Sequence, residues 1–177
     1  MQYPEKLQKG YRIGVTATSA GFNEEPDIKR LENGIRHFNE LGYPVIETDN
    51  VRSNLKGRSS DGQTRAKQLM ALWSDPEVRA IFAVSGGEYL VEMLPYMDYE
   101  ALRTEPKWLQ GYSDTTGILF TITTNLDIAT IYSNNFGSFG MEHWHSSLSD
   151  NIRILEGEDL VQHSFSMYQD EFRERIT

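Results

Sequence analysis

Ser113 stands in a sequence context that is typical of a catalytic nucleophile. The stretch from Lys107 to Gly117 reads KWLQGYSDTTG, so an apolar run ends at Gly111-Tyr112 and a helix-forming segment begins directly after Ser113. A sharp turn between a strand and a helix holds a serine hydroxyl clear of the backbone, as in the nucleophile elbow of serine hydrolases. The segment therefore predicts Ser113 as a nucleophile.

The predicted helix after Ser113 adds a group that stabilises negative charge. The first N–H groups of a helix have no partner inside it, and its positive dipole end favours a developing oxyanion. The backbone N–H of Asp114 is the first candidate donor. The pattern departs from G-x-S-x-G because Thr115 stands at the second glycine. This segment alone is also compatible with a purely structural role, in which the side chain of Ser113 or Asp114 caps the helix.

A pair of glycines follows another predicted strand. Ser85, Gly86, Gly87 and Glu88 come directly after the apolar run 78–84. Ligands of parallel sheets bind beyond the carboxyl ends of the strands, and glycines let backbone N–H groups approach them closely. We expect Gly86 or Gly87 to supply a second oxyanion donor, with Ser85, Gly86 and Glu88 contacting the substrate. The alternative is an ordinary strand-to-helix turn.

The segments around these residues predict an α/β domain. Five short apolar runs are expected to be strands, at residues 11–18, 43–48, 78–84, 107–112 and 127–132. Four helical patterns separate them. The first runs from Ile28 to a stop at Gly42, and the second begins after an N-cap at Asp61. The third covers 89–94, and the fourth runs from Thr115 to about Asn125. Alternating strands and helices indicate a parallel sheet, here in a flavodoxin-like, three-layer α/β arrangement. The sequence does not determine the strand order.

The pattern changes after Gly140. A helix capped by Ser149 and ended by Gly157 is expected first, and from Val161 a second apolar stripe follows at helical spacing, with Phe165, Tyr168, Phe172 and Ile176. We expect residues 1–140 to form the nucleophile-bearing domain and 141–177 a linker or the start of a further, absent domain. A terminal helix that folds back on the domain is the alternative.

Composition excludes several classes of function. The chain has 17 Lys and Arg against 26 Asp and Glu, a net charge of −9, so it is not expected to bind nucleic acid. The absence of cysteine excludes disulfides, thiolate metal sites and a cysteine nucleophile. No signal peptide or membrane-length apolar run is present, which favours a cytoplasmic protein with no membrane partner.

An ordered series of short segments resembles the LD-carboxypeptidase family of serine peptidases, which includes the microcin C immunity peptidases. The resemblance covers roughly residues 5 to 140. The matching segments are Leu7 to Val15, Arg65-Ala66, Asp75 to Ile81, Gly86-Gly87, Leu94 to Tyr99, Pro106-Lys107 and Gly111 to Thr116. Each segment alone is common, but the series in this order is specific.

The resemblance implies an activity and its site. Ser113 would be the nucleophile of a Ser-His-Glu triad that uses no metal or cofactor, with the amides of Asp114 and Gly87 as oxyanion donors. The His and Glu would lie in a C-terminal domain outside this chain. The family trims D-alanine from murein tetrapeptides during cell-wall recycling, or cleaves an aminoacyl-nucleotide analogue, so a peptide-like substrate and a homodimer are expected. This chain departs from the family pattern at two places. Many members have an Arg where Ser85 stands and a Gly-Pro at 133–135, so the resemblance does not determine the identity of the substrate.

The four histidines of the chain offer no clear local base. They are His37, His143, His145 and His163, and His37 is expected to be solvated on its helix. His143 and His145 flank Trp144 and are read as a metal pair, as a base near Ser113, or as an ordinary loop, which we favour. A serine without a base is a poor nucleophile, so this chain alone is expected to be nearly inactive. The competing interpretation is a non-catalytic, flavodoxin-like ligand-binding module.

Overall fold

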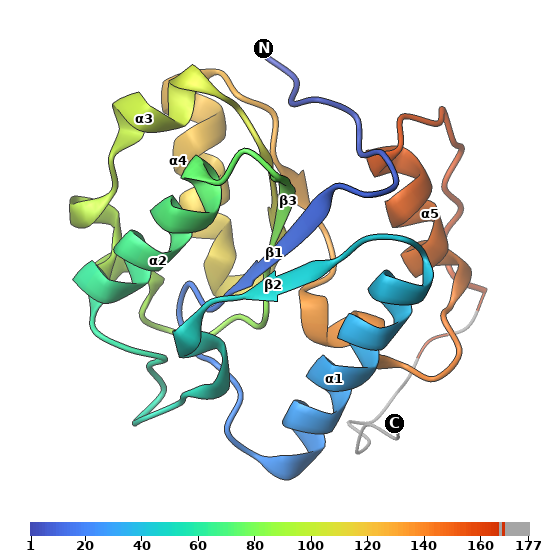
Figure 1. Ribbon diagram of the computed structural model, residues 1–177, viewed down its shortest axis with the longest axis horizontal. Helices are drawn as coiled ribbons and strands as arrows, with labels where there is room; N and C mark the ends of the chain where they lie inside the picture. Colours follow the sequence, from blue (N-terminus) through green and yellow to red (C-terminus); the bar gives the residue numbers. More distant parts are fainter. Residues whose placement is uncertain (167, 169–177) are drawn as a thin grey trace.

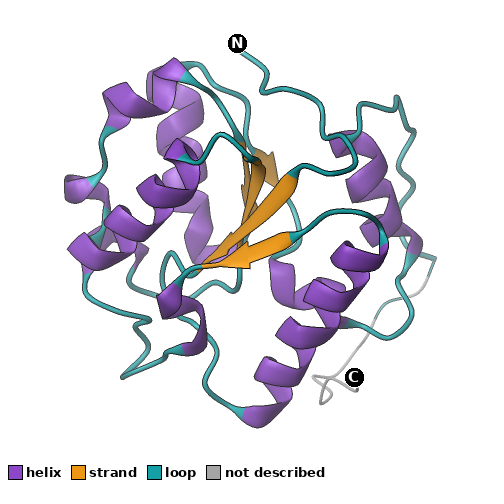
Figure 2. Cartoon of the chain, viewed as in Figure 1, coloured by secondary structure: helices purple, strands orange, loops and turns teal. Residues whose placement is uncertain are grey.

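Five parallel strands form the centre of the computed structural model, which describes residues 1–166 and 168. The strand order β2-β1-β3-β4-β5 is that of flavodoxin-like folds. Figure 2 shows the strands gathered between the helices. The predicted α/β class with a parallel sheet is therefore confirmed. The strands are β1 (Arg12–Thr16), β2 (Val45–Glu47), β3 (Val78–Ala83), β4 (Trp108–Gly111) and β5 (Ile131–Tyr132).

Helices cover both faces of the sheet and give three layers (Figure 1). One face carries α1 (Glu25–Glu40) and α5 (Ser146–Leu155). The other carries α2 (Gly62–Ser74), α3 (Tyr99–Thr104) and α4 (Thr116–Leu126). The two-residue alternation of a strand explains this division. In β1, Ile13 and Val15 are buried in the α1 core, whereas a Cβ on Gly14 would lie 2.9 Å from Leu72 of α2.

The core beneath α1 is built largely from aromatic side chains. Phe38 of α1 stacks on Phe136 with their ring centroids 5.2 Å apart, and both rings meet Phe82 of β3 edge-on. Phe136 lies in a 3₁₀ segment, η5 (Phe136–Gly140), that follows β5. Offset and edge-to-face contacts of this kind add to the energy of simple burial. They fix the segment after β5, which borders the carboxyl end of the sheet.

The fifth strand is much shorter than predicted. We expected a strand over 127–132, but β5 holds only Ile131 and Tyr132. Asp127 adopts a left-handed backbone conformation with φ of 58° at the end of α4, which turns the chain away from strand geometry. Ile128 forms only an isolated bridge to Gln2.

The helix predicted at 89–94 was also wrong. The segment forms two 3₁₀ turns, η2 (Leu90–Glu92) and η3 (Leu94–Tyr96), in place of an α-helix. Pro95 lacks a backbone N–H and disfavours the helical conformation in the residue before it, which limits the segment to short turns. Gly42, with φ of 87°, follows the end of α1 as expected.

The last described helix, α5, packs on the same core as α1. Leu148, Ile152 and Leu155 are buried there, and the amides of Asn151 and Gln110 of β4 exchange hydrogen bonds of 2.6 and 2.9 Å. The cap is His145, whose ring accepts from the Ser147 N–H, and the expected Ser149 lies inside the helix.

The apolar stripe expected from Val161 is not helical where the structure describes it. Val161 and Phe165 lie in an irregular segment and are 80% and 66% exposed. Phe172 and Ile176 lie outside the described residues. The domain boundary at residue 140 stays a prediction. No helix within residues 1–166 is long and apolar enough to span a bilayer.

Candidate active site

Ser113 lies at a strained turn between β4 and α4. Its φ of 62° is in the left-handed region, which residues other than glycine seldom adopt. The residue begins a short 3₁₀ turn, η4 (Ser113–Thr115), and is exposed. Among the described residues no group hydrogen-bonds to its hydroxyl, so the side chain does not cap the helix. This arrangement is typical of a nucleophile elbow.

Three contacts hold the elbow in place. Asn135 is buried, and its Oδ1 accepts a 3.0 Å hydrogen bond from the Tyr112 N–H. Thr115 is completely buried, and its hydroxyl lies 3.1 Å from that of Thr18 in the segment after β1. The Asp114 carboxylate accepts a 2.9 Å hydrogen bond from the Leu90 N–H, so it too makes no cap. The elbow is thereby tied to the ends of three other strands.

The glycine pair after β3 lies directly against the elbow. A Cβ added to Gly86 would come within 3.0 Å of Ser113 Oγ and 3.5 Å of the Asp114 nitrogen. Gly87 has φ of 149° and faces the Ser19 side chain, so a larger residue is excluded there as well. The Ser85 hydroxyl donates to the Ala20 carbonyl at 2.7 Å, which is a structural contact.

A buried guanidinium joins the two loops that flank Ser113. Arg65 of α2 has a completely buried side chain and donates to the carbonyls of Thr18 at 3.0 Å and Tyr89 at 2.9 Å. Burial lowers the pKa of Arg65, because desolvation disfavours its charged form. The Ser19 hydroxyl accepts from the Tyr89 N–H at 2.9 Å. The loops after β1 and β3 are thus fixed to each other.

These loops border an open, shallow pocket of about 330 Å³ at the carboxyl ends of the strands. Ser113, Ser85, Gly86 and Gly87 line it, whereas Glu88 is exposed and does not. The other lining residues are Ala20, Gly21, Phe22, Asp27, Asn54, Tyr112 and Asn135.

Two backbone N–H groups near Ser113 are available to a ligand. The N–H of Asp114 is in the first turn of η4, where a helix offers no acceptor. No described residue accepts a hydrogen bond from the Gly87 N–H. Gly87 and Ser113 line the same pocket, and free N–H groups near a serine hydroxyl are what acyl transfer needs to stabilise a tetrahedral oxyanion.

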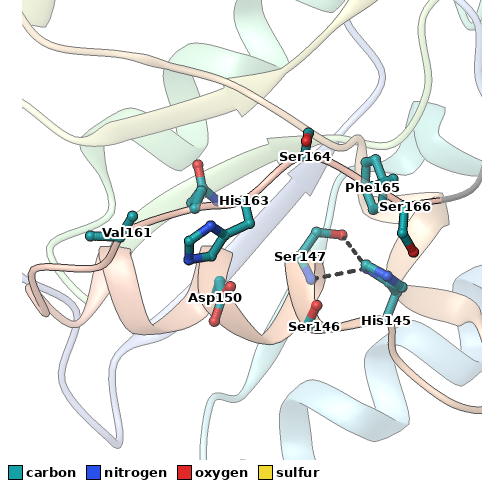
Figure 3. Close-up of a pocket in the computed structure, with 10 residues that line it drawn as sticks. His145, Ser146, Ser147, Asp150, Val161, His163, Ser164, Phe165 and Ser166 are labelled. Atoms are coloured by element: carbon teal, nitrogen blue, oxygen red, sulfur yellow. Dashed lines mark hydrogen bonds between the residues drawn. The ribbon is translucent and has the colours of Figure 1, made fainter.

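The pocket contains no histidine, although all four lie among the described residues. His37 is not solvated as predicted: its Nδ1 lies 3.1 Å from the Phe139 carbonyl oxygen and its ring packs edge-on against Trp144. His143 is exposed. His145 and His163 border a separate pocket of about 430 Å³ beside α5 (Figure 3). Within the described residues no three His, Asp or Glu side chains gather as a metal site.

Among the lining residues that sequence reasoning missed, three have carboxylate or amide side chains. Asp27 comes from the first turn of α1, Asn54 from the loop after η1 (Asp49–Arg52), and Asn135 from the segment after β5. Asn135 comes shortly after the predicted strand 127–132. Its place beyond the carboxyl end of a strand could have identified it as a pocket residue. For Asp27 and Asn54 no sequence pattern indicates the pocket, because the sheet order alone brings them near Ser113.

Comparison with known proteins gives one consistent result. The family model described as the LD-carboxypeptidase N-terminal domain matches residues 13–133. A Vibrio cholerae protein named "Putative carboxypeptidase" is 33% identical over 132 residues, which are 75% of this chain and 39% of that protein. The microcin C7 self-immunity protein MccF of Escherichia coli is 28% identical over 126 residues, 71% of this chain and 36% of MccF.

Solved structures agree with the sequence comparison. MccF without ligand superposes with a TM-score of 0.80 at 27% identity, over 89% of this chain and 48% of MccF. A MccF-like protein from Bacillus anthracis gives a TM-score of 0.80 at 29% identity, over 88% and 47% of the two chains. The chain spans about two fifths of the length of the curated relatives it matches.

Proposed function

This chain belongs to the LD-carboxypeptidase family, and we propose that it is the nucleophile-bearing domain of a serine peptidase that hydrolyses an amide bond. The observation that carries the proposal is the exposed Ser113, held at a positive φ of 62° against Gly86. The strain of such a turn is retained when the surrounding structure fixes it for function.

In the proposed reaction, Ser113 Oγ attacks the carbonyl carbon of the substrate amide while a general base takes the hydroxyl proton. The carbonyl oxygen becomes an oxyanion and accepts hydrogen bonds from the N–H groups of Asp114 and Gly87. The carbon–nitrogen bond then breaks, and the base returns the proton to the departing amine. Water hydrolyses the resulting acyl-serine by the same two steps and frees Ser113.

We propose that the base and its orienting acid, a His and a Glu, come from a C-terminal domain outside this chain. Two facts support this. No histidine lines the described pocket around Ser113, and the relatives are more than twice as long as the matched region. This chain alone is then expected to turn over substrate very slowly, because loss of triad residues typically costs about a million-fold in turnover.

The proposed substrate is a small peptide or a peptide-like amide. Solved structures of MccF contain adenosine monophosphate and aspartyl sulfamoyl adenosine. A Bacillus subtilis relative, 27% identical, carries the name of a murein peptide carboxypeptidase. Both classes of substrate, a murein tetrapeptide and an aminoacyl-nucleotide analogue, fit an oxyanion site of this type. A cytoplasmic location and a homodimer stay predictions.

The proposal is tested by hydrolysis of a murein tetrapeptide and of an aspartyl sulfamoyl adenosine analogue. This chain alone and the longer protein that the proposal requires are assayed side by side, each with a Ser113→Ala variant. We expect turnover only in the longer protein with Ser113 present. Turnover that survives Ser113→Ala would refute the nucleophile, and rapid turnover by this chain alone would refute the external base.

A further inference from the structure

A second open pocket, of about 240 Å³, lies where the end of α1 meets the segment that leads into α5. Its lining residues are His37, Glu40, Leu41, Glu142 and Trp144. None of them lines the pocket around Ser113, so the two pockets can bind different ligands.

The carbonyl oxygen of Phe139 fixes the two aromatic rings of this second pocket. It accepts a 2.9 Å hydrogen bond from Trp144 Nε1 and lies 3.1 Å from His37 Nδ1. A carbonyl oxygen can only accept, and the guanidinium of Arg36, 3.0 Å from His37 Nε2, can only donate. These partners assign the proton of His37 to Nδ1. The rings are therefore fixed in place, and His37 is neutral in this arrangement.

One negative charge at this pocket has no partner among the described residues. Glu40 forms a 3.0 Å ion pair with Arg36, so these two charges offset each other. The exposed carboxylate of Glu142 pairs with no residue of the described chain. The pocket therefore attracts cations and repels anions.

The chemistry of the lining favours an organic cation that needs no hydrogen-bond acceptor. The Phe139 carbonyl and His37 Nε2 already have donors, and the described residues contain no group of three His, Asp or Glu that could hold a metal ion. A quaternary ammonium group donates no hydrogen bond, and the face of a tryptophan ring attracts its charge. Leu41, which is 39% exposed, offers apolar surface to the methyl groups of such a cation.

We propose that this pocket binds a small organic cation with a quaternary ammonium group, which contacts the Trp144 ring and is balanced by the Glu142 carboxylate. Trp144 is half-buried, and its contacts with His37, Phe38 and Phe139 are edge-on or tilted, so none of these rings stacks on it in parallel. The volume of about 240 Å³ is below the usual range for drug-sized ligands, which favours a small one.

The inference is tested by binding to this chain, and it does not depend on the proposed peptidase reaction. The probes are choline and neohexyl alcohol, in which an uncharged tert-butyl group replaces the trimethylammonium group of choline. NMR titrations followed through the backbone amide signals of Leu41 and Glu142 give the two dissociation constants. We expect choline to bind about tenfold more tightly, which corresponds to a partly desolvated cation–π contact.

Trp144→Leu should abolish this preference, because it keeps an apolar side chain and removes the aromatic face. Glu142→Gln changes an exposed residue and should reduce the preference severalfold without affecting the fold. Glu25→Gln is the matched control, since Glu25 is an exposed acid in the first turn of α1 and does not line the pocket. It should keep the preference.

Equal binding of the two probes, binding of neither, or a preference that survives Trp144→Leu or Glu142→Gln would overturn the inference. Phosphatidylcholine vesicles carry the same headgroup on a membrane surface. Once choline binds with the expected preference, cosedimentation with these vesicles that is lost in Trp144→Leu would assign the site to a lipid headgroup. The absence of cosedimentation would assign it to a free small molecule.

Discussion

Arg65 and Glu92 form a 2.7 Å ion pair in which the guanidinium is completely buried and the carboxylate is partly exposed. Arg65 also donates to the carbonyl groups of Thr18 and Tyr89, in the loops after β1 and β3. One side chain from α2 therefore fixes both loops that border Ser113. Its removal is expected to affect stability and the site together.

Arg65→Met should lower the free energy of unfolding by about 3 kcal/mol, because a buried and a partly buried carbonyl lose their donor and the ion pair of a buried guanidinium is broken. Urea unfolding followed by circular dichroism measures the loss. Arg36→Met is the control, since Arg36 pairs with Glu40 at 3.0 Å on the surface of α1. That change should stay within about 0.5 kcal/mol. Equal losses in the two variants would contradict the structural role of Arg65.

Gly86→Ala should slow the reaction of Ser113 with a fluorophosphonate about 100-fold, with a much smaller effect on folding. The new Cβ would lie 2.9 Å from the Ser113 Cβ, so the serine must move, and small displacements of a nucleophile are costly. The rate is measured with a fluorophosphonate probe on the longer protein. Gly10→Ala is the control for position: its φ of 94° makes alanine costly to the fold, but its Cβ meets no atom within 4 Å and lies at the opposite end of the sheet, so the rate should stay unchanged. Normal labelling of Gly86→Ala would show that the contact is unimportant.

Asn135→Ala should destabilise the elbow. Asn135 is 6% exposed and its Oδ1 is the acceptor for the Tyr112 N–H, which would lose its partner. The expected cost is about 1–3 kcal/mol, and labelling of Ser113 should slow as the turn relaxes. The control is Asn39→Ala, at an exposed position of α1, with an expected change within about 0.5 kcal/mol. A variant as stable and as reactive as the original chain would refute this role of Asn135.

The acid sensitivity of the fold should depend in part on Asp61. Hydrogen bonds from the Thr64 N–H and hydroxyl, at 2.9 and 2.8 Å, hold the pKa of Asp61 below its ordinary value of 3.8. The folded state therefore prefers the ionised form. The stability that Asp61 contributes is present above pH 3.8 and is lost as the pH falls through the lower pKa of the folded state.

Asp61→Asn keeps an acceptor for the cap and cannot titrate. The difference in unfolding free energy between the original chain and this variant should therefore shrink as the pH falls below 3.8. Denaturant unfolding between pH 6 and pH 3, about the range in which carboxylates titrate, measures it. A constant difference across this range would contradict the assignment.

The class of the fold and the position of Ser113 were predictable from sequence because both depend on local signals. Alternating strand and helix patterns determine an α/β class, and a short glycine-containing turn marks the elbow. The pocket was not predictable to the same extent. Asp27 and Ser113 are far apart in the sequence and become neighbours only through the order of the strands. The sequence alone does not reveal that order.

Two local predictions were wrong for local reasons. The apolar residues before Pro95 predict an α-helix, but proline restricts the segment to 3₁₀ turns. Serine is a common cap, which favours Ser149, but the cap of α5 is His145, one turn earlier, whose ring nitrogen accepts a hydrogen bond from the Ser147 N–H. Capping by histidine has no strong sequence signature.

The most direct test of the account is covalent labelling of Ser113. The longer protein is treated with a fluorophosphonate, and the modified peptide is identified by mass spectrometry. We predict one adduct, on Ser113, that is absent from the Ser113→Ala variant and forms far more slowly in this chain alone. An adduct on another residue, or labelling that persists in Ser113→Ala, would contradict the assignment of Ser113 as the nucleophile.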